Sequence, residues 1–131
     1  MLKTASMVLG VVLLLVGLLG FIPNGLVGEG AAFQTDLLHN LVHLLTGAIL
    51  LLLGKSPELS KWLKILGVVY ALLAVLGFLG GDMILGFIST GGGSNWLHLV
   101  LAVVFLGLPR MAKGGSAPMT TPVGGGMPGQ M

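Results

Sequence analysis

The sequence predicts an all-α fold, an integral membrane four-helix bundle built from two parallel two-helix repeats. Hydrophobic residues make up 55% of the 131 residues and charged residues only 8%, with a mean hydropathy of +1.06. Soluble domains carry about 25% charged residues, so this chain lacks the polar surface that a water-soluble fold needs. Apolar segments separated by turn sequences, and a motif that recurs along the chain, are the two further observations that predict this fold.

The predicted helices cover residues 5–22, 37–54, 60–80 and 95–111, which together form a transmembrane domain over residues 1–112. A bilayer core needs about 20 helical residues, with about 17 as the lower limit. The first three segments meet this limit and the fourth is short. Residues 113–131 are rich in Gly, Pro and Ser, so we expect them to form a disordered cytoplasmic tail.

The breaks between the helices are typical turn sequences. "IPNG", from Ile22 to Gly25, ends the first helix because Pro removes a backbone donor and Asn-Gly favours a turn. In "GKSPELSK", Gly54 suits a helix C-terminus and Ser56 an N-cap. This short link makes the second and third helices antiparallel neighbours.

The charges predict one orientation. All six basic residues fall on one side of the four-span arrangement, and three of the four acids fall on the other; Glu58 is the exception. The basic residues are Lys3, Lys55, Lys61, Lys64, Arg110 and Lys113, and the three acids are Glu29, Asp36 and Asp82. Basic loops favour the cytoplasm, so we expect a multi-pass protein of the inner (plasma) membrane with both termini cytoplasmic.

The first and third segments resemble each other. "LGVVLLLVGLLGFI" from Leu9 and "LGVVYALLAVLGFL" from Leu66 are identical at eight of fourteen positions. Each contains small residues at matched places: Gly10, Gly17 and Gly20 in the first, Gly67, Ala74 and Gly77 in the third. The match predicts a parallel repeat, with small residues allowing close helix approach. It also argues that the first segment is a retained helix rather than a cleaved signal peptide.

The few polar residues of the second and fourth segments share an N-x-x-H spacing. Asp36, His39, Asn40 and His43 lie on one stripe of the second helix, and Asn95 and His98 occupy matching positions on the fourth. Polar groups inside a bilayer are costly and normally face the bundle interior. Asp36 and Asn95 are also candidate N-caps, and Asp36 and His39 have no counterparts on the fourth helix.

Three functions are compatible with these residues. The first is a structural or interaction role, in which the motifs form an interhelical polar clasp near the outer face, each Asn bonding the opposite His. The second is a haem- or metal-binding site with His43 and His98 as ligands, and the third is a small transporter or proton-linked channel. Of these we favour the clasp, with no cofactor and no metal.

Several functions are excluded or disfavoured. The chain has no Cys, so thiolate chemistry is excluded, and it shows no nucleophile motif or phosphate loop, so we expect no enzyme. Nothing resembles a nucleic-acid-binding surface. The expected partner is the lipid bilayer; protein partners are unidentified, and a homo-oligomer stays open.

The motifs together resemble a known family. "LGVVLLLVGLLGFIP", "LLHNLVHLLTG", "ILGVVYALLAVLGF" and "NWLHLVLAVV" are similar to the DUF4383 family of small four-span bacterial membrane proteins, over Val8 to about Leu108. The most specific pieces are His39-Asn40-x-x-His43-Leu44 and Asn95-x-x-His98-Leu99. The resemblance implies four membrane helices and supplies no activity. The first loop, "VGEGAAFQTD", carries no firm family motif.

Overall fold

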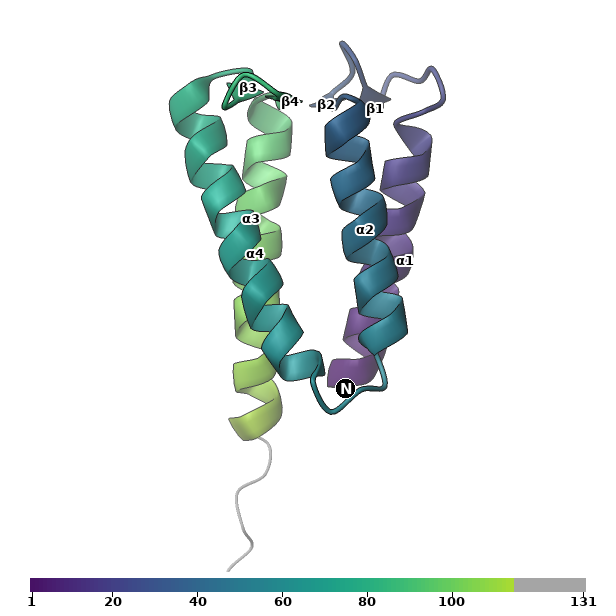
Figure 1. The fold of residues 1–131 in the computed structure, drawn as a ribbon, viewed down its shortest axis with the longest axis vertical. Coiled ribbons are helices and arrows are strands. Elements are labelled where there is room, and N and C mark those ends of the chain that lie inside the picture. The colour runs from purple at the N-terminus through teal and green to yellow at the C-terminus, as the bar shows by residue number, and fades with distance from the viewer. Residues whose placement is uncertain (115–131) are drawn as a thin grey trace, which may run out of the picture.

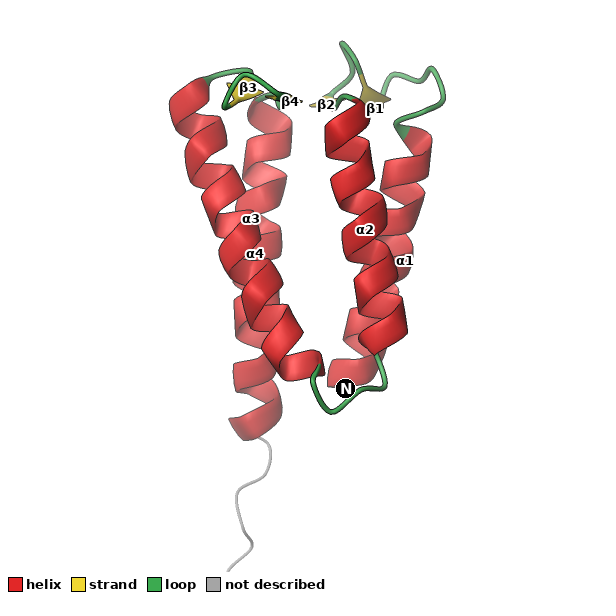
Figure 2. Ribbon diagram, viewed as in Figure 1, coloured by secondary structure: helices red, strands yellow, loops and turns green. Residues whose placement is uncertain are grey.

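The computed structural model describes residues 1–114 and confirms an all-α four-helix bundle (Figures 1 and 2). The helices are α1 (Leu2–Leu19), α2 (Leu37–Leu53), α3 (Leu59–Gly80) and α4 (Gly92–Gly114). Two short strand pairs lie in the loops: β1 (Val27–Gly28) with β2 (Phe33–Gln34) in parallel, and β3 (Met83–Ile84) with β4 (Ile88–Ser89) antiparallel.

The helices form two antiparallel hairpins, α1 with α2 and α3 with α4. Both strand-containing loops lie at one end of the bundle, and the short turn between α2 and α3 lies at the other, next to the N-terminus (Figure 1). We call these the loop end and the turn end. The expected antiparallel pairing of α2 and α3 follows from this short turn.

The first helix ends earlier than predicted, at Leu19 instead of Ile22. The Asn24 side chain organises the loop that follows: its amide donates to the Leu19 carbonyl at 2.9 Å and to the Val27 carbonyl at 2.8 Å. Its oxygen accepts from the Val27 amide at 2.8 Å. One asparagine therefore satisfies backbone groups that would otherwise be left free beyond the helix end.

The prediction that the fourth helix is the short one was wrong. Helix α4 has 23 residues because it begins at Gly92 and continues to Gly114, three residues beyond the predicted bounds at each end, whereas α2 has 17 and is the shortest. Asp36 caps the start of α2 and Gly54 follows its end, which fixes its length. The predicted tail lies outside the described residues from position 115 onward, and α4 includes its first two residues, 113 and 114.

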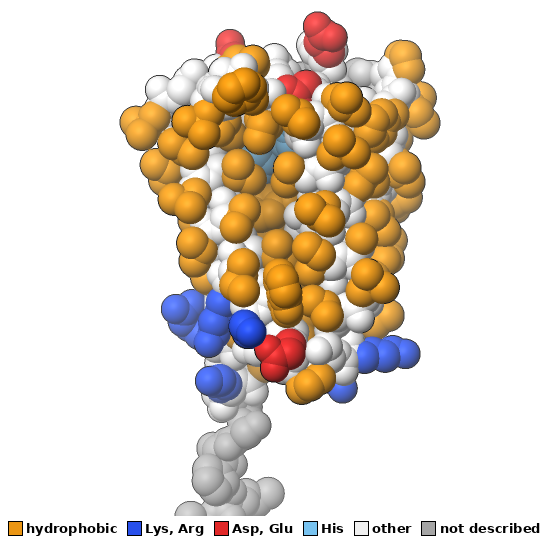
Figure 3. Space-filling model, in the orientation of Figure 1, with side chains coloured by type: hydrophobic (Ala, Val, Ile, Leu, Met, Phe, Trp, Pro, Cys, Tyr) orange, Lys and Arg blue, Asp and Glu red, His pale blue; other side chains and the backbone are white. Residues whose placement is uncertain are grey.

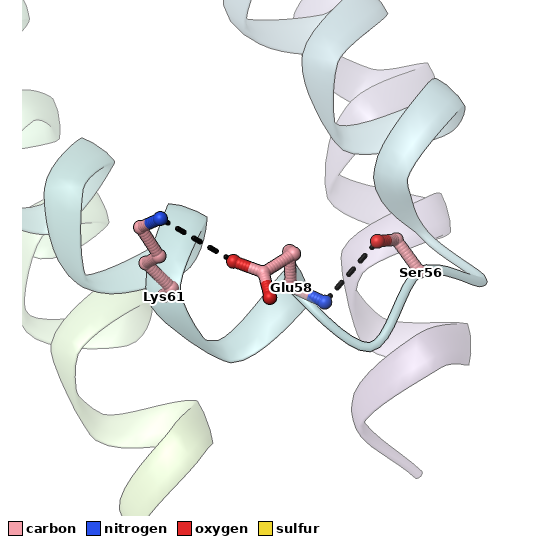
Figure 4. A network of polar contacts seen from close by, with 3 residues as sticks. All are labelled: Ser56, Glu58 and Lys61. Atoms are coloured by element: carbon pink, nitrogen blue, oxygen red, sulfur yellow. Dashed lines mark hydrogen bonds and ion pairs between the residues drawn. The ribbon is translucent and has the colours of Figure 1, made fainter.

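At the turn end, the prediction that Ser56 is the N-cap of α3 was wrong, because α3 begins only at Leu59 and its N-cap residue is Glu58. The Ser56 hydroxyl accepts from the Glu58 amide at 3.1 Å, and Glu58 pairs with Lys61 at 3.4 Å (Figure 4). Both charged side chains are more than half exposed, at 69% and 56%, and such surface pairs contribute about 0–1 kcal/mol. The turn is therefore held by backbone geometry more than by this ion pair.

The outer surface of the helices is apolar. In Figure 3 orange hydrophobic side chains cover the middle of the visible face, while Lys and Arg gather at the turn end and acidic side chains at the loop end, with one acid among the basic residues. Three helices, α1, α3 and α4, are long and apolar enough to cross a membrane, and α2 is a shorter apolar helix. This surface suits a membrane protein.

Close helix packing within each hairpin depends on glycine. A β-carbon at Gly47 of α2 would lie 2.7 Å from the Gly10 carbonyl oxygen of α1, and one at Gly67 of α3 would lie 2.6 Å from Leu106 of α4. These glycines leave no room for a side chain, so the helix backbones approach closely. Between the hairpins, the shared core is formed by Leu13, Leu50, Leu59, Leu63, Leu66, Tyr70, Leu101, Ala102 and Phe105.

Candidate functional site

Helix α2 has two buried faces with different partners. His39, His43, Thr46 and Leu50 face the α3–α4 hairpin, as the contacts of His39 with α4 and of Thr46 with α3 show. Asn40 and Gly47 instead pack on α1. At 100° per residue the two sets lie roughly 80° apart. The single polar stripe predicted from the sequence is therefore two stripes that serve different interfaces.

Helix α4 divides in the same way. Asn95 packs on Gly77 of α3, within its own hairpin. His98 faces the other hairpin and contacts His39 of α2. Both His98 and Asn95 are almost fully buried, with 1% and 3% of their surfaces exposed.

The three histidines of the chain form one buried cluster between the hairpins. The ring centroid of His39 lies 4.7 Å from that of His43 and 4.9 Å from that of His98, and the centroids of His43 and His98 are 6.2 Å apart. The Nε2 atoms of His39 and His98 are 3.0 Å apart, which is hydrogen-bond distance. The structure thus joins the predicted site residues His43 and His98 through His39, which the sequence left without a counterpart.

The contacts of His39 fix which nitrogens carry protons in the neutral cluster. His39 Nδ1 lies 2.8 Å from the Ser89 carbonyl oxygen, which can only accept, so Nδ1 donates. The Nε2 atom of neutral His39 is then an acceptor, and His98 Nε2 must donate to it. This assignment leaves His98 Nδ1 without a proton.

Asp36 supports this arrangement from the loop end. One carboxylate oxygen accepts from the His39 amide at 2.8 Å, which is the predicted N-cap of α2. The other accepts from the Ser89 amide at 2.6 Å. Because the Ser89 carbonyl accepts from His39, one carboxylate holds both the backbone and the ring of this histidine in place.

Three more hydrogen bonds connect the hairpins. The Gln34 amide donates to the Ser89 hydroxyl at 2.8 Å, and the Ser94 hydroxyl donates to the Gln34 carbonyl at 2.9 Å. Deeper in the bundle, the Tyr70 hydroxyl donates to Thr46 at 3.2 Å. Sequence reasoning missed these residues, although Thr46 is three residues after His43 and so on the same helix face.

The expected bonding of each Asn to the opposite His is absent from the described residues. The Asn40 side chain occupies the space above Gly20, and Asn95 that above Gly77, each within its own hairpin. The side-chain oxygens of both Asn lack a hydrogen-bond partner. Asn95 is also not the N-cap of α4, because the helix begins three residues earlier at Gly92.

Three ring nitrogens of the cluster are buried without a hydrogen-bond partner among residues 1–114. They are both nitrogens of His43 and Nδ1 of His98. A buried polar atom left unsatisfied costs about 1–3 kcal/mol, and native structures contain few of them. Each ring can offer one nitrogen as a ligand atom, and these three nitrogens lie within 4.8 Å of one another.

The cluster leaves no space for a haem bound by His43 and His98, which was one form of the second function predicted from the sequence. His39 lies less than 5 Å from both other rings by centroid distance, at 4.7 and 4.9 Å, and all three side chains are at most 2% exposed. A porphyrin between His43 and His98 would have to displace His39. A cavity of about 540 Å³ does open at the loop end, lined by Glu29, Gln34, Asp36, Asn40 and Ser89 among others.

The turn-end half of the described bundle is filled mostly with apolar side chains, and Ser6 of α1 is a buried polar residue among them. Below Thr46 and Tyr70 the space between the hairpins holds Leu50, Leu63 and Phe105, each with 0% of its surface exposed. Ions or polar solutes would have to cross this packed layer, so the arrangement does not favour the transporter or channel function.

Comparison with known families gives one match. Residues 3–110 match the family described as Domain of unknown function (DUF4383), which covers most of the chain. The comparisons with curated proteins and with solved structures find no match.

Proposed function

The chain belongs to the DUF4383 family, a domain of unknown function, and we propose that its role is structural. In this proposal the chain is an integral membrane protein without catalytic machinery. A polar junction centred on His39 and His98 fastens its two hairpins near the loop end. The observation that carries the proposal is the 3.0 Å contact between the Nε2 atoms of these two residues.

The glycine contacts support the proposed parallel repeat. Gly20 faces Asn40 in the first hairpin as Gly77 faces Asn95 in the second. Gly10 faces Leu51 as Gly67 faces Leu106. In both sets of contacts, the matched residues of α1 and α3 are 57 positions apart, and those of α2 and α4 are 55 positions apart. The two hairpins therefore pack alike. The junction, in contrast, joins the hairpins through His39, which has no histidine counterpart.

The role of the junction is tested by comparing two histidine substitutions in metal-free protein. His39→Leu removes two hydrogen bonds, to Ser89 and His98, and should lower the unfolding free energy by about 1–2 kcal/mol. His43→Leu is the matched control: it replaces a neighbouring ring whose nitrogens bond nothing, so it should leave stability unchanged or raise it.

The measurement is thermal unfolding of the purified full chain in detergent after treatment with a chelator. Equal melting temperatures for His39→Leu and the unsubstituted protein would contradict a stabilising junction. If His43→Leu lowers the melting temperature as much as His39→Leu does, burial of the rings and not the hydrogen bonds holds the hairpins together.

We further infer that the turn end faces the cytoplasm, because the basic residues gather there (Figure 3). The chain has no Cys, so single cysteines can report orientation. A membrane-impermeant maleimide should label Glu29→Cys in intact cells, and should label Lys55→Cys only after permeabilisation. The reverse pattern would show the opposite orientation.

A further inference from the structure

We propose that the histidine cluster binds one transition-metal ion of the class that prefers imidazole, zinc or copper, with His39, His43 and His98 as ligands. This proposal goes beyond the structural role of the junction, which requires no ion. It also differs from a pair of ligands on His43 and His98, because His39 provides the third.

The ligand set has the composition of a known type of metal site. Three imidazoles with one open position are a common arrangement for zinc, and imidazole also suits copper. Calcium and magnesium prefer oxygen ligands, which the cluster lacks. The chain has no Cys and just three His, and all three histidines lie in this cluster.

The distances require little movement of the rings. Nitrogen ligands around a tetrahedral zinc ion lie about 3.4 Å apart, given zinc–nitrogen bonds of about 2.0–2.1 Å. His39 Nε2 and His98 Nε2 are already 3.0 Å apart, and the ligand atoms of all three rings fall within 4.8 Å of one another. If side-chain rotation moves the ligand nitrogens of His43 and His98 by roughly 1–2 Å, the site closes around an ion.

The atoms around the rings support an ion at this place. His39 donates Nδ1–H to the Ser89 carbonyl, and metal-binding histidines commonly donate their second nitrogen to such an oxygen. Asp36 in turn holds the Ser89 amide, so a carboxylate lies behind the ligand. Both nitrogens of His43, which is 2% exposed, have no hydrogen-bond partner in the part of the chain that the structure describes, and an ion would satisfy one of them.

Binding would replace the hydrogen bond between His39 and His98. The His98 proton, which Nε2 carries in the metal-free cluster, would move to Nδ1 by exchange, and the Nε2 lone pairs of both rings would then be free for the ion. The cavity of about 540 Å³ at the loop end includes Glu29 and Asp36 in its lining, and their carboxylates would attract a cation toward the cluster.

The test measures metal content of the full chain, purified in detergent with an affinity tag that contains no histidine. Chelator-treated protein is incubated with Zn²⁺ or with Cu²⁺, freed of excess metal by gel filtration, and analysed by mass spectrometry of the elements. We expect about one ion per chain in at least one of the two arms. For copper, electron paramagnetic resonance should show coupling to imidazole nitrogens.

His43→Leu should lose the ion while its metal-free melting temperature stays unchanged or rises, which separates loss of a ligand from loss of folding. Thr46→Val is the matched control, because it changes a buried polar residue on the same face without removing a ligand. It should bind as the unsubstituted chain does. The proposal is overturned if neither metal is retained, or if His43→Leu retains as much. Neither result would affect the metal-free test of the junction.

Discussion

Gly47→Ala is expected to lower the free energy of unfolding by about 3 kcal/mol, at the upper end of the usual range for overpacking. The new β-carbon would lie 2.7 Å from the Gly10 carbonyl oxygen and 2.9 Å from the Leu14 backbone nitrogen. Backbone atoms cannot rotate away as the end of a side chain can. Helices α1 and α2 would therefore have to move apart along their whole contact.

The control for this prediction is Gly107→Ala in α4, where a β-carbon would meet no atom within 4 Å. It should leave the melting temperature unchanged or slightly raised, since alanine favours helix more than glycine does. Thermal unfolding in the same detergent compares the two variants. Equal melting temperatures for both would show that α1 and α2 do not depend on this close contact.

The second large effect is expected for Asp36→Ala, at about 2.5–4 kcal/mol. The substitution removes the cap of α2 and a hydrogen bond from the Ser89 amide to a charged group, which contribute about 1 and about 1.5–3 kcal/mol. It also frees Ser89, whose carbonyl orients the His39 ring. The loss therefore extends from the loop end into the histidine cluster.

Asp82→Ala is the matched control, because Asp82 is an exposed acid of the same end whose side chain makes no hydrogen bond among the described residues. Chemical denaturation can compare the two variants with the unsubstituted chain. If both lose the same small amount, Asp36 acts only through its charge. A loss confined to Asp36→Ala supports the hydrogen bonds by which Asp36 holds His39 and Ser89.

Much of the fold could be predicted from the sequence, because apolar helices joined by turns can pack together in only a few ways. The limits of α2 and the cap by Asp36 were predictable from local chemistry. The length of α4 was not, because Gly92 and Gly93 at its start and Gly114 at its end normally disfavour helix. In the structure the first turn of α4 is buried, and the Ser94 hydroxyl donates to the Gln34 carbonyl of the other hairpin.

The candidate site was predicted only in part. Spacing placed Asn40 and His43 on one stripe, but it does not say which neighbour each part of a stripe faces. Gly20 and Gly77 contained the missing signal, since each provides the space that an Asn side chain fills. The position of the Ser89 carbonyl depends on how the loop folds, and a backbone oxygen leaves no trace in the sequence.

The hydrogen bond between His39 and His98 is the centre of this account, and nuclear magnetic resonance can detect it directly. In metal-free protein with ¹⁵N-labelled histidine, we expect spin coupling across the bond between the two Nε2 atoms, with the His39 proton on Nδ1. The coupling should disappear in His39→Leu. Histidine resonances without any such coupling, and with the His39 proton on Nε2, would contradict the junction.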